Sequence, residues 1–297
     1  MSVLCGWASQ DERGKASGGK AGDQTGREVK TGPWYQFGQT VVIRPQDRNK
    51  GKQMAQVMKK ICNNPHVGYD QSQRTTLWAQ MSRNGWNPDK ITVNCETDCS
   101  ALTAVVCKTI GYNISPDVWT GNLRAALART KEFSAMTSTY YTQQSKGLRA
   151  GDIILNPARH VIMAIADGPV VKGQEGINKM IGAKLLLDGS RGATTKKCEV
   201  MAVQTGLIRD YKVKLTVTGN YNLATKAAVG KHPVQPGMKG DLVKACQCIL
   251  YDHGYDPNGI DGSYGPGMKK AVGAFQKANG LVVDYSIGQK TMLRLLS

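Results

Sequence analysis

The sequence lacks any uninterrupted apolar run of about 18 residues, which excludes a transmembrane helix. Its first six residues lack the positively charged start and the long apolar stretch of a secretory signal peptide. We therefore expect a protein that is made in a cytosol and has no stable association with a membrane.

Metal-ligand spacing is also missing. Cys95 and Cys99 have no second cysteine pair at the spacing of a zinc finger, and Cys246 and Cys248 would point to different faces of a helix. A disulfide scaffold is typical of short secreted chains, whereas this chain has 297 residues. We expect mostly reduced cysteines, no metal site and no cofactor.

Acidic residues are scarce: 22 Asp and Glu stand against 39 Lys and Arg, which gives a net charge of +17. Such an excess indicates an anionic partner. The charge is not accompanied by zinc-finger spacing, a recognition-helix motif or an aromatic RNA-binding signature, so we expect no nucleic-acid partner. The length predicts about two domains.

The domain boundary is expected near residue 218. Residues 211–217 alternate polar and apolar side chains, which is typical of a strand, and residues 230–237 are rich in Pro and Gly, which is typical of a linker. The sequence thus predicts a catalytic domain over residues 1–218, a linker over 219–236 and a small domain over 237–297.

The last segment has the apolar spacing of three short helices: one beginning at Asp241, one containing Phe275 and ending before Gly280, and one over residues 289–296. Residues 240–247, 260–266 and 271–284 resemble the peptidoglycan-binding domain, a three-helix module of many cell-wall hydrolases. The resemblance implies wall binding through the loop at residues 261–266, which contains Asp261 and Tyr264. Phe275 is expected in the core.

Cys99 is the first candidate for chemistry. Asp98 is a suitable N-cap residue, and the residues after it have the apolar face of a helix that ends at Gly111. Cys99 would be the first residue of this helix, where the helix dipole and free backbone N–H groups favour a thiolate. A cysteine at this position is a plausible nucleophile.

A thiolate nucleophile needs an imidazole nearby. Among the four histidines, His160 is the best placed, because residues 151–171 have the pattern of strand, tight turn, strand, and a third short strand after Gly168. Periodicity alone favours a structural role for a lone histidine at the start of a strand.

The two stretches together resemble the papain-like cell-wall hydrolases of the NlpC/P60 and CHAP group. Residues 21–29, 34–35, 41–44 and 68–71 resemble the N-terminal half of phage and prophage endolysins. The resemblance implies an α+β fold, with a papain-like catalytic domain before the three-helix module. It implies that Cys99 is the nucleophile and His160 the general base, with Asp98 and Ser100 beside the substrate.

Two further positions follow from this resemblance. Tyr69 corresponds to the family's tyrosine beside the cysteine, although Gly68 to Asp70 also fits an ordinary turn. The residue that orients the imidazole falls near Lys172, which cannot accept a hydrogen bond, so Gln174 is the nearest substitute.

The implied function is that of an endolysin, which cleaves an amide bond in the stem peptide of peptidoglycan. An N-acetylmuramoyl-L-alanine amidase with the same machinery and an inactive wall-binding protein are alternatives, and glycan cleavage by Asp11/Glu12 or Glu96/Asp98 is a third. The expected partners are peptidoglycan and, functionally, a holin. We expect a monomer that stays in the host cytoplasm until lysis and then acts on the cell wall.

Overall fold

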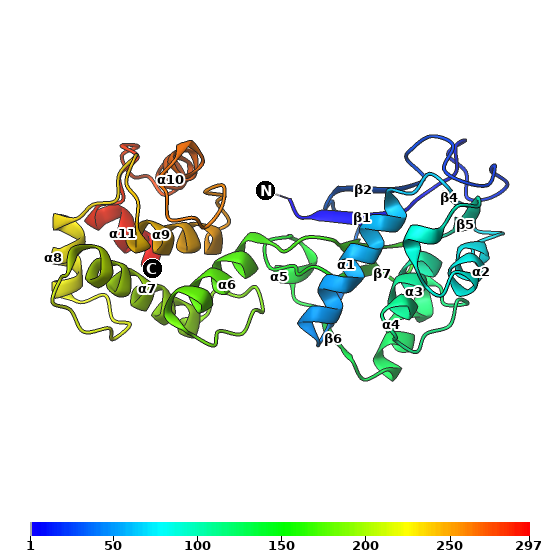
Figure 1. The fold of residues 1–297 in the computed structure, drawn as a ribbon, viewed down its shortest axis with the longest axis horizontal. Coiled ribbons are helices and arrows are strands. Elements are labelled where there is room, and N and C mark those ends of the chain that lie inside the picture. Colours follow the sequence, from blue (N-terminus) through cyan, green and yellow to red (C-terminus); the bar gives the residue numbers. More distant parts are fainter. Residues whose placement is uncertain (1) are drawn as a thin grey trace. The chain divides into compact units, whose positions relative to one another are not determined.

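The computed structural model describes residues 2–297, which divide into two compact units, Ser2–Asp167 and Gly168–Ser297. We call them the N-terminal and the C-terminal unit (Figure 1). The division lies between Asp167 and Gly168, whereas the sequence pattern placed it near residue 218.

The N-terminal unit is built on a six-stranded sheet in which all neighbouring strands are antiparallel. A separate parallel pair joins β4 (Val67–Tyr69) to β5 (Cys95–Thr97). In order across the six-stranded sheet, the strands are β2 (Val29–Pro33), β1 (Leu4–Ala8), β8 (His160–Ala164), β7 (Ile153–Asn156), β3 (Val41–Pro45) and β6 (Phe133–Met136).

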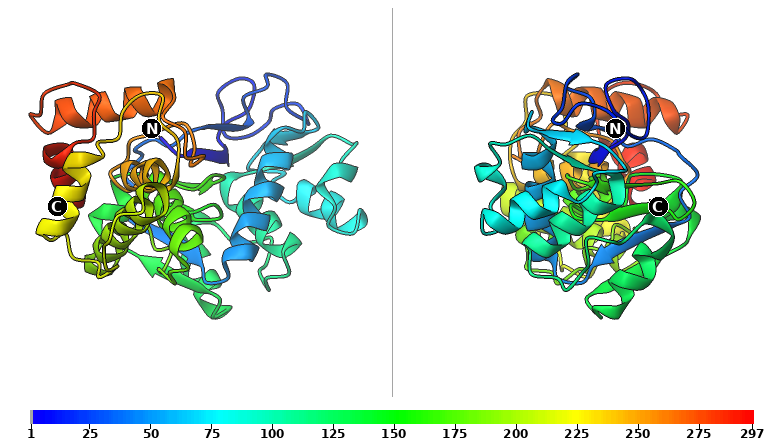
Figure 2. Two further views of the ribbon diagram at one scale, coloured as in Figure 1. Left: turned by 60° about the vertical axis from the view of Figure 1, so that its left-hand side comes forward. Right: turned by 90° about the vertical axis from the view of Figure 1, so that its right-hand side faces the viewer.

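Helices α1 and α3 pack against each other and against this sheet (Figure 2). Their buried residues, among them Met58 and Leu102, form one core with Val161 and Met163 of β8. A smaller core contains Trp7 and Ile162. The helices of this unit are α1 (Arg48–Cys62), α2 (Thr76–Arg83), the 3-10 turn η1 (Pro88–Lys90), α3 (Cys99–Thr109), α4 (Thr120–Arg129) and α5 (Thr139–Thr142).

Two predicted local structures are confirmed: the helix that begins at Cys99 and the hairpin of β7 and β8. The predicted third strand after Gly168 is wrong, because Pro169 begins a helix there. Proline suits the first turn of a helix, where its missing N–H would have no partner.

The Gly-rich segment between β1 and β2 is tied to the domain by buried carboxylates. The Gly18 N–H donates to Asp70 and the Gly22 N–H donates to Glu96, each at 2.7 Å. Glu28 accepts from the N–H groups of Gln24 (2.8 Å) and Tyr69 (3.1 Å). Composition alone is typical of a flexible arm, whereas the family resemblance makes the segment part of the catalytic domain, and these bonds tie it into the folded unit.

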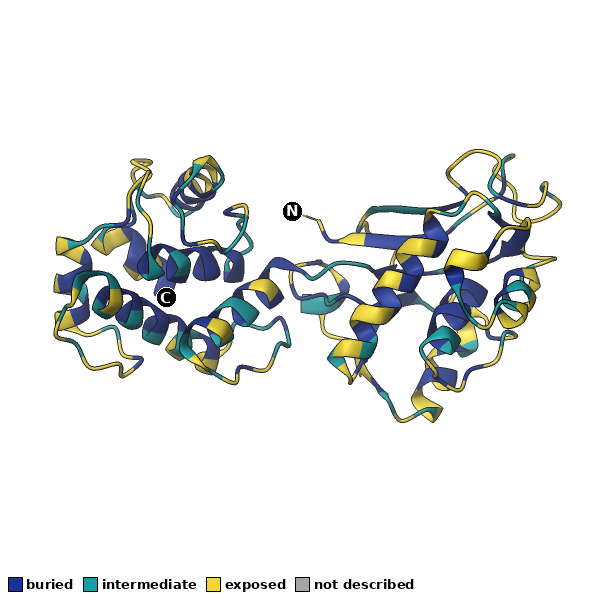
Figure 3. Ribbon diagram, viewed as in Figure 1, coloured by how far each residue is buried: buried dark blue, intermediate teal, exposed yellow. Residues whose placement is uncertain are grey.

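The C-terminal unit is entirely helical apart from two isolated bridges within residues 168–297. One hydrophobic core runs through it and includes Val203 and Leu207 from its first half and Ile249 and Phe275 from its second (Figure 3). Its helices are α6 (Pro169–Ile181), α7 (Ala193–Tyr211), α8 (Leu223–Lys231), α9 (Asp241–Asp252), α10 (Pro266–Ala278) and α11 (Gln289–Leu296).

The three helices predicted in the last segment are confirmed as α9, α10 and α11. The strand predicted over residues 211–217 is wrong: α7 extends to Tyr211, and residues 212–217, all of them described, pair with no strand. The stretch predicted as a linker contains α8.

Candidate active site

The start of α3 is held by a network around Asp98. Its Oδ1 accepts from the Ala101 N–H at 2.7 Å and from the Ser100 hydroxyl at 2.9 Å, as an N-cap residue does. Arg74 Nε lies 2.8 Å from Asp98 Oδ2, and Arg74 Nη2 donates to Ser100 Oγ at 3.1 Å and to the Val118 carbonyl. The network fixes the backbone from which the Cys99 side chain projects.

Cys99 is buried at the first position of α3. Burial raises the pKa of its thiol to about 11, and the Asp98 carboxylate adds to the rise. The backbone N–H groups of Val161 and Ser100 act in the opposite direction and lower the pKa. Burial therefore has the larger effect on this pKa, and the sulfur is a thiol at neutral pH. Helix α3 packs against β8, and Cys99 shares a buried core with Val161, the residue that follows His160 in β8.

His160 is the first residue of β8 and packs edge-to-face on Phe37, with ring centroids 5.4 Å apart. Burial lowers the pKa of the imidazole to about 4, so it is neutral at pH 7. Its Nε2 is buried and has no hydrogen-bond partner among the described residues. Within residues 2–297, no hydrogen bond or ion pair joins the imidazole to the Cys99 sulfur; the neutral imidazole has a free nitrogen that can accept a proton.

Two tyrosines lie within electrostatic range of the Cys99 sulfur. Burial raises the pKa of both Tyr35 and Tyr69 to about 12, and Cys99 contributes to each rise. The Tyr69 hydroxyl accepts from Gln71 Nε2 at 3.0 Å, and Tyr35 packs against Phe37 with centroids 5.4 Å apart. Tyr69, expected beside the cysteine, is thus close enough for Cys99 to affect its pKa. The sequence patterns did not identify Tyr35 or Arg74 as part of the site.

Two family models match the chain. A model of an endolysin-like domain matches residues 5–171, more than half of the chain. The chain belongs to the endolysin-like domain family. A model of a peptidoglycan-binding domain, described as putative, matches residues 239–295. No curated protein matches the chain. The two domains indicate an endolysin-type enzyme with a cell-wall lytic function and peptidoglycan as its partner.

The endolysin-like domain also contains a group of buried acids, Glu28, Asp70 and Glu96. Burial raises the pKa of Glu96 to about 7, and the nearby Glu28 and Asp70 carboxylates contribute. Glu96 Oε2 is buried without a hydrogen-bond partner in the described part of the chain. One member of each acid pair weighed for glycan cleavage forms an ion pair: Asp11 with Arg13 at 2.7 Å, and Asp98 with Arg74 at 2.8 Å.

Gln174 does not have the surroundings expected of a residue that orients His160. It lies in α6 of the C-terminal unit, outside the endolysin-like match, and is completely buried. Its amide nitrogen donates to Asp188 Oδ1 at 3.0 Å, and its amide oxygen accepts from the Gly189 N–H at 3.0 Å. Both the nitrogen and the oxygen of the Gln174 amide are hydrogen-bonded to a loop of the C-terminal unit. We therefore do not propose Gln174 as the third catalytic residue.

The residues expected to contact the wall are also engaged internally. Asp261 Oδ1 accepts from Gln247 at 2.8 Å, and the buried Tyr264 donates its hydroxyl proton to the Tyr285 carbonyl at 2.5 Å. Asp98 and Ser100 likewise hold the start of α3. These four side chains position loops and a helix start.

Across residues 2–297, no group of three or more His, Cys, Asp or Glu side chains could hold a metal ion. All eight cysteines are unpaired. No helix in the described chain is both long and apolar enough to cross a membrane.

Proposed function

We propose that the endolysin-like domain has a papain-like arrangement and cleaves an amide bond of peptidoglycan, with Cys99 as the nucleophile and His160 as the general base. One observation carries the proposal: α3, which begins with Cys99, packs against β8, which begins with His160, and Cys99 and Val161 lie in one buried core.

The resting state of this pair is a neutral thiol and a neutral imidazole, as the directions of the two pKa shifts require. His160 removes the thiol proton as the sulfur attacks the carbonyl carbon of the substrate. The backbone N–H of Cys99, at the free end of α3, donates to the oxyanion. His160 then protonates the leaving amine, and water hydrolyses the thioester and regenerates the thiol.

The bond cleaved is one in the stem peptide, and the peptidoglycan-binding domain holds the substrate polymer near the site. The junction between the peptide and N-acetylmuramic acid is an amide of the same kind and would need the same machinery. Mass spectrometry of digested peptidoglycan separates the two reactions: an endopeptidase releases a new amino group within the peptide, whereas an amidase releases the whole stem peptide.

The test is Cys99→Ala, assayed by clearing of purified cell walls. We expect clearing to stop while co-sedimentation with the walls continues, because the binding domain is untouched. Cys198→Ala is the matched control, since Cys198 lies in α7 of the other unit and is partly exposed. If Cys99→Ala clears walls at the wild-type rate, Cys99 is not the nucleophile.

A second candidate is a wall-binding protein without catalysis. The observation that favours it is that no hydrogen bond joins His160 to Cys99 among the described residues. Catalytic hydrogen bonds often shorten only when substrate binds, so this geometry fits both an active hydrolase and an inactive wall-binding protein. An activity assay distinguishes the two. Wild-type protein that releases no soluble fragment from purified sacculi would establish the second candidate.

A further inference from the structure

The first half of the C-terminal unit repeats a hydrogen-bond motif of the second half. In α9, Gln247 Nε2 donates to Asp261 Oδ1 (2.8 Å) and to the Ser263 carbonyl (3.1 Å), and its Oε1 accepts from the Gly262 N–H (2.8 Å). One glutamine thereby clasps the loop that follows its helix. This clasp lies inside the match to the peptidoglycan-binding domain.

Gln174 in α6 makes the same three bonds to the loop after α6. Its Nε2 donates to Asp188 Oδ1 (3.0 Å) and to the Ser190 carbonyl (2.9 Å), and its Oε1 accepts from the Gly189 N–H (3.0 Å). The partners stand 14, 16 and 15 residues after the glutamine in both clasps. Both loops have the sequence Asp-Gly-Ser.

The second helix of each half carries a matching glutamine. Gln276 in α10 donates to Asp284 Oδ1 (2.7 Å) and to the Ser286 carbonyl (2.9 Å), and it accepts from the Tyr285 N–H (3.0 Å). Gln204 in α7 donates to Thr218 Oγ1 (3.4 Å) and to the Asn220 carbonyl (3.1 Å), and it accepts from the Gly219 N–H (3.1 Å).

The spacing of this second clasp shows where the halves differ. The acceptor side chains stand 14 residues after Gln204 and 8 after Gln276, so the first half has six extra residues between helix and loop. Each clasp also reaches a threonine in the helix that follows: Thr225 at 3.0 Å from Gln204 and Thr291 at 3.2 Å from Gln276. The order of three helices and two clasped loops is therefore common to both halves.

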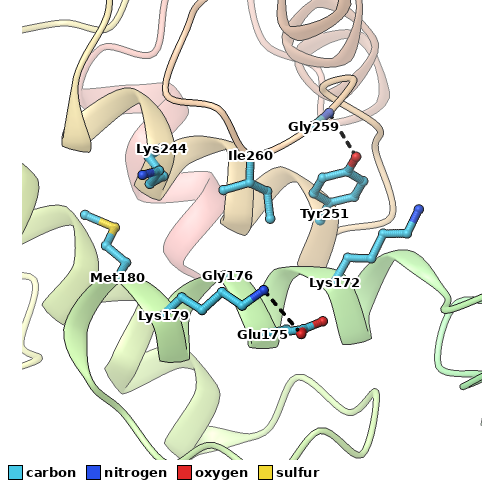
Figure 4. Close-up of a pocket in the computed structure, with 9 residues that line it drawn as sticks. All are labelled: Lys172, Glu175, Gly176, Lys179, Met180, Lys244, Tyr251, Gly259 and Ile260. Carbon is cyan, nitrogen blue, oxygen red and sulfur yellow. Dashed lines mark hydrogen bonds and ion pairs between the residues drawn. The ribbon is translucent and has the colours of Figure 1, made fainter. Parts of the chain in front are cut away.

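The two halves pack through their first helices. A Cβ added at Gly173 of α6 would lie 2.6 Å from the Cys248 carbonyl of α9, and one at Gly176 would lie 2.6 Å from the Cys248 sulfur, so glycine permits this close approach. Beside it lies a cavity of about 380 Å³ that is lined by residues of both helices, among them Glu175 of α6 and Tyr251 of α9; the Tyr251 hydroxyl accepts from the Gly259 N–H at 3.1 Å (Figure 4).

We propose that residues 169–231 are a second, divergent copy of the peptidoglycan-binding repeat, so that the C-terminal unit holds the wall with two copies. The surface to which we assign binding is basic in both. Lys196 and Lys197 follow Asp188 at the same spacing at which Lys269 and Lys270 follow Asp261. Lys197 and Lys270 are exposed, each as the fifth residue of its helix (α7 and α10), and suit the carboxylates of stem peptides. The proposal depends on the match at residues 239–295 and not on the chemistry of Cys99.

The test compares three charge reversals in the full-length protein: Lys197→Glu in the first copy, Lys270→Glu in the second, and Lys214→Glu as the control. Lys214 is exposed in the segment between α7 and the loop that Gln204 clasps, where the six extra residues lie. Co-sedimentation is measured at 4 °C with purified peptidoglycan stripped of teichoic acid, and again with walls that retain this anionic polymer. Circular dichroism and the melting temperature check that each variant folds.

We expect Lys197→Glu and Lys270→Glu each to weaken binding to stripped peptidoglycan by about tenfold, because a bivalent binder loses avidity when either module is weakened, and the control to bind as wild type. If Lys197→Glu binds like the control while Lys270→Glu does not, the first half is no binding repeat. Equal binding by all four proteins also overturns the proposal. A loss confined to walls with teichoic acid would overturn peptidoglycan as the ligand. If a reversal disturbs folding, Lys197→Gln and Lys270→Gln make the same comparison with a smaller change.

Discussion

Alkylation of Cys99 by iodoacetamide tests the neutral resting state directly, because only the thiolate reacts. A pKa of about 11 leaves about one sulfur in a thousand ionised at pH 8. A free cysteine with a pKa of about 8.5 is about one quarter ionised at that pH. We therefore expect Cys99 to react about 200-fold more slowly than a free cysteine on account of its pKa alone.

The slope of the reaction with pH is more informative than the rate. Limited access to a buried sulfur slows alkylation equally at every pH, whereas the thiolate fraction rises tenfold per pH unit below the pKa. We expect the rate at Cys99 to rise by about one decade per unit from pH 7 to pH 10. Mass spectrometry of the peptide that contains Cys99 separates it from Cys107, which is completely buried and serves as an internal reference.

An alkylation rate that no longer rises with pH at values below pH 8 would refute this reasoning. It would show that Cys99 is already a thiolate, stabilised by a protonated His160. His160→Gln sharpens the comparison. In a preformed ion pair, loss of the imidazolium would raise the pKa of Cys99 and slow alkylation, whereas in a neutral pair the slope stays unchanged.

Four other predictions follow from the described geometry. The kcat/KM of wall hydrolysis should rise with an apparent pKa near 4 as His160 loses its proton and stay level to pH 8; a rise centred near pH 7 would contradict a lowered His160 pKa. Glu96→Gln should raise the melting temperature above pH 7 and not below pH 4.5, because a folded-state pKa of about 7 makes wild-type stability fall as pH rises through that range; a pH-independent difference would argue against it. Phe275→Ala, at a core position, should lower the free energy of unfolding by about 3–5 kcal/mol in urea, and a loss under about 1 kcal/mol would mean that the site collapses. Wall binding should weaken as salt is raised, since the chain carries +17; binding that is constant across a wide salt range would make that charge incidental.

Local signals accounted for much of the fold. The helix at Cys99 follows from one cap residue and an apolar face, and the hairpin that begins β8 with His160 follows from alternation around a tight turn. Both depend on residues close in sequence. Other features join residues that are far apart in the chain, and no sequence spacing predicts them. Examples are the ion pair of Arg74 with Asp98 and the position of Tyr35 near Cys99.

The segment after Tyr211 shows how a correct pattern led to a wrong element. Val213 and Leu215 do pack against the core while Lys212 and Lys214 are exposed, so the alternation is real. A segment with alternating burial forms a strand only where a neighbouring strand supplies hydrogen bonds. The described C-terminal unit has no strand beside residues 212–217. The sequence Asp-Gly-Ser occurs at residues 188–190 and again at 261–263. Comparison of the two stretches could have indicated the repeat, whereas neither stretch indicates it alone.

The close approach of α6 and α9 bears on how such lysins are recombined. Truncation of the chain within residues 219–236 would remove α6, which lies against Cys248 of α9. The apolar face of α9 would then be exposed to water and would favour aggregation. The cassette to exchange between chimaeric enzymes therefore begins at Gly168, directly after the last residue of the N-terminal unit, and carries all six helices.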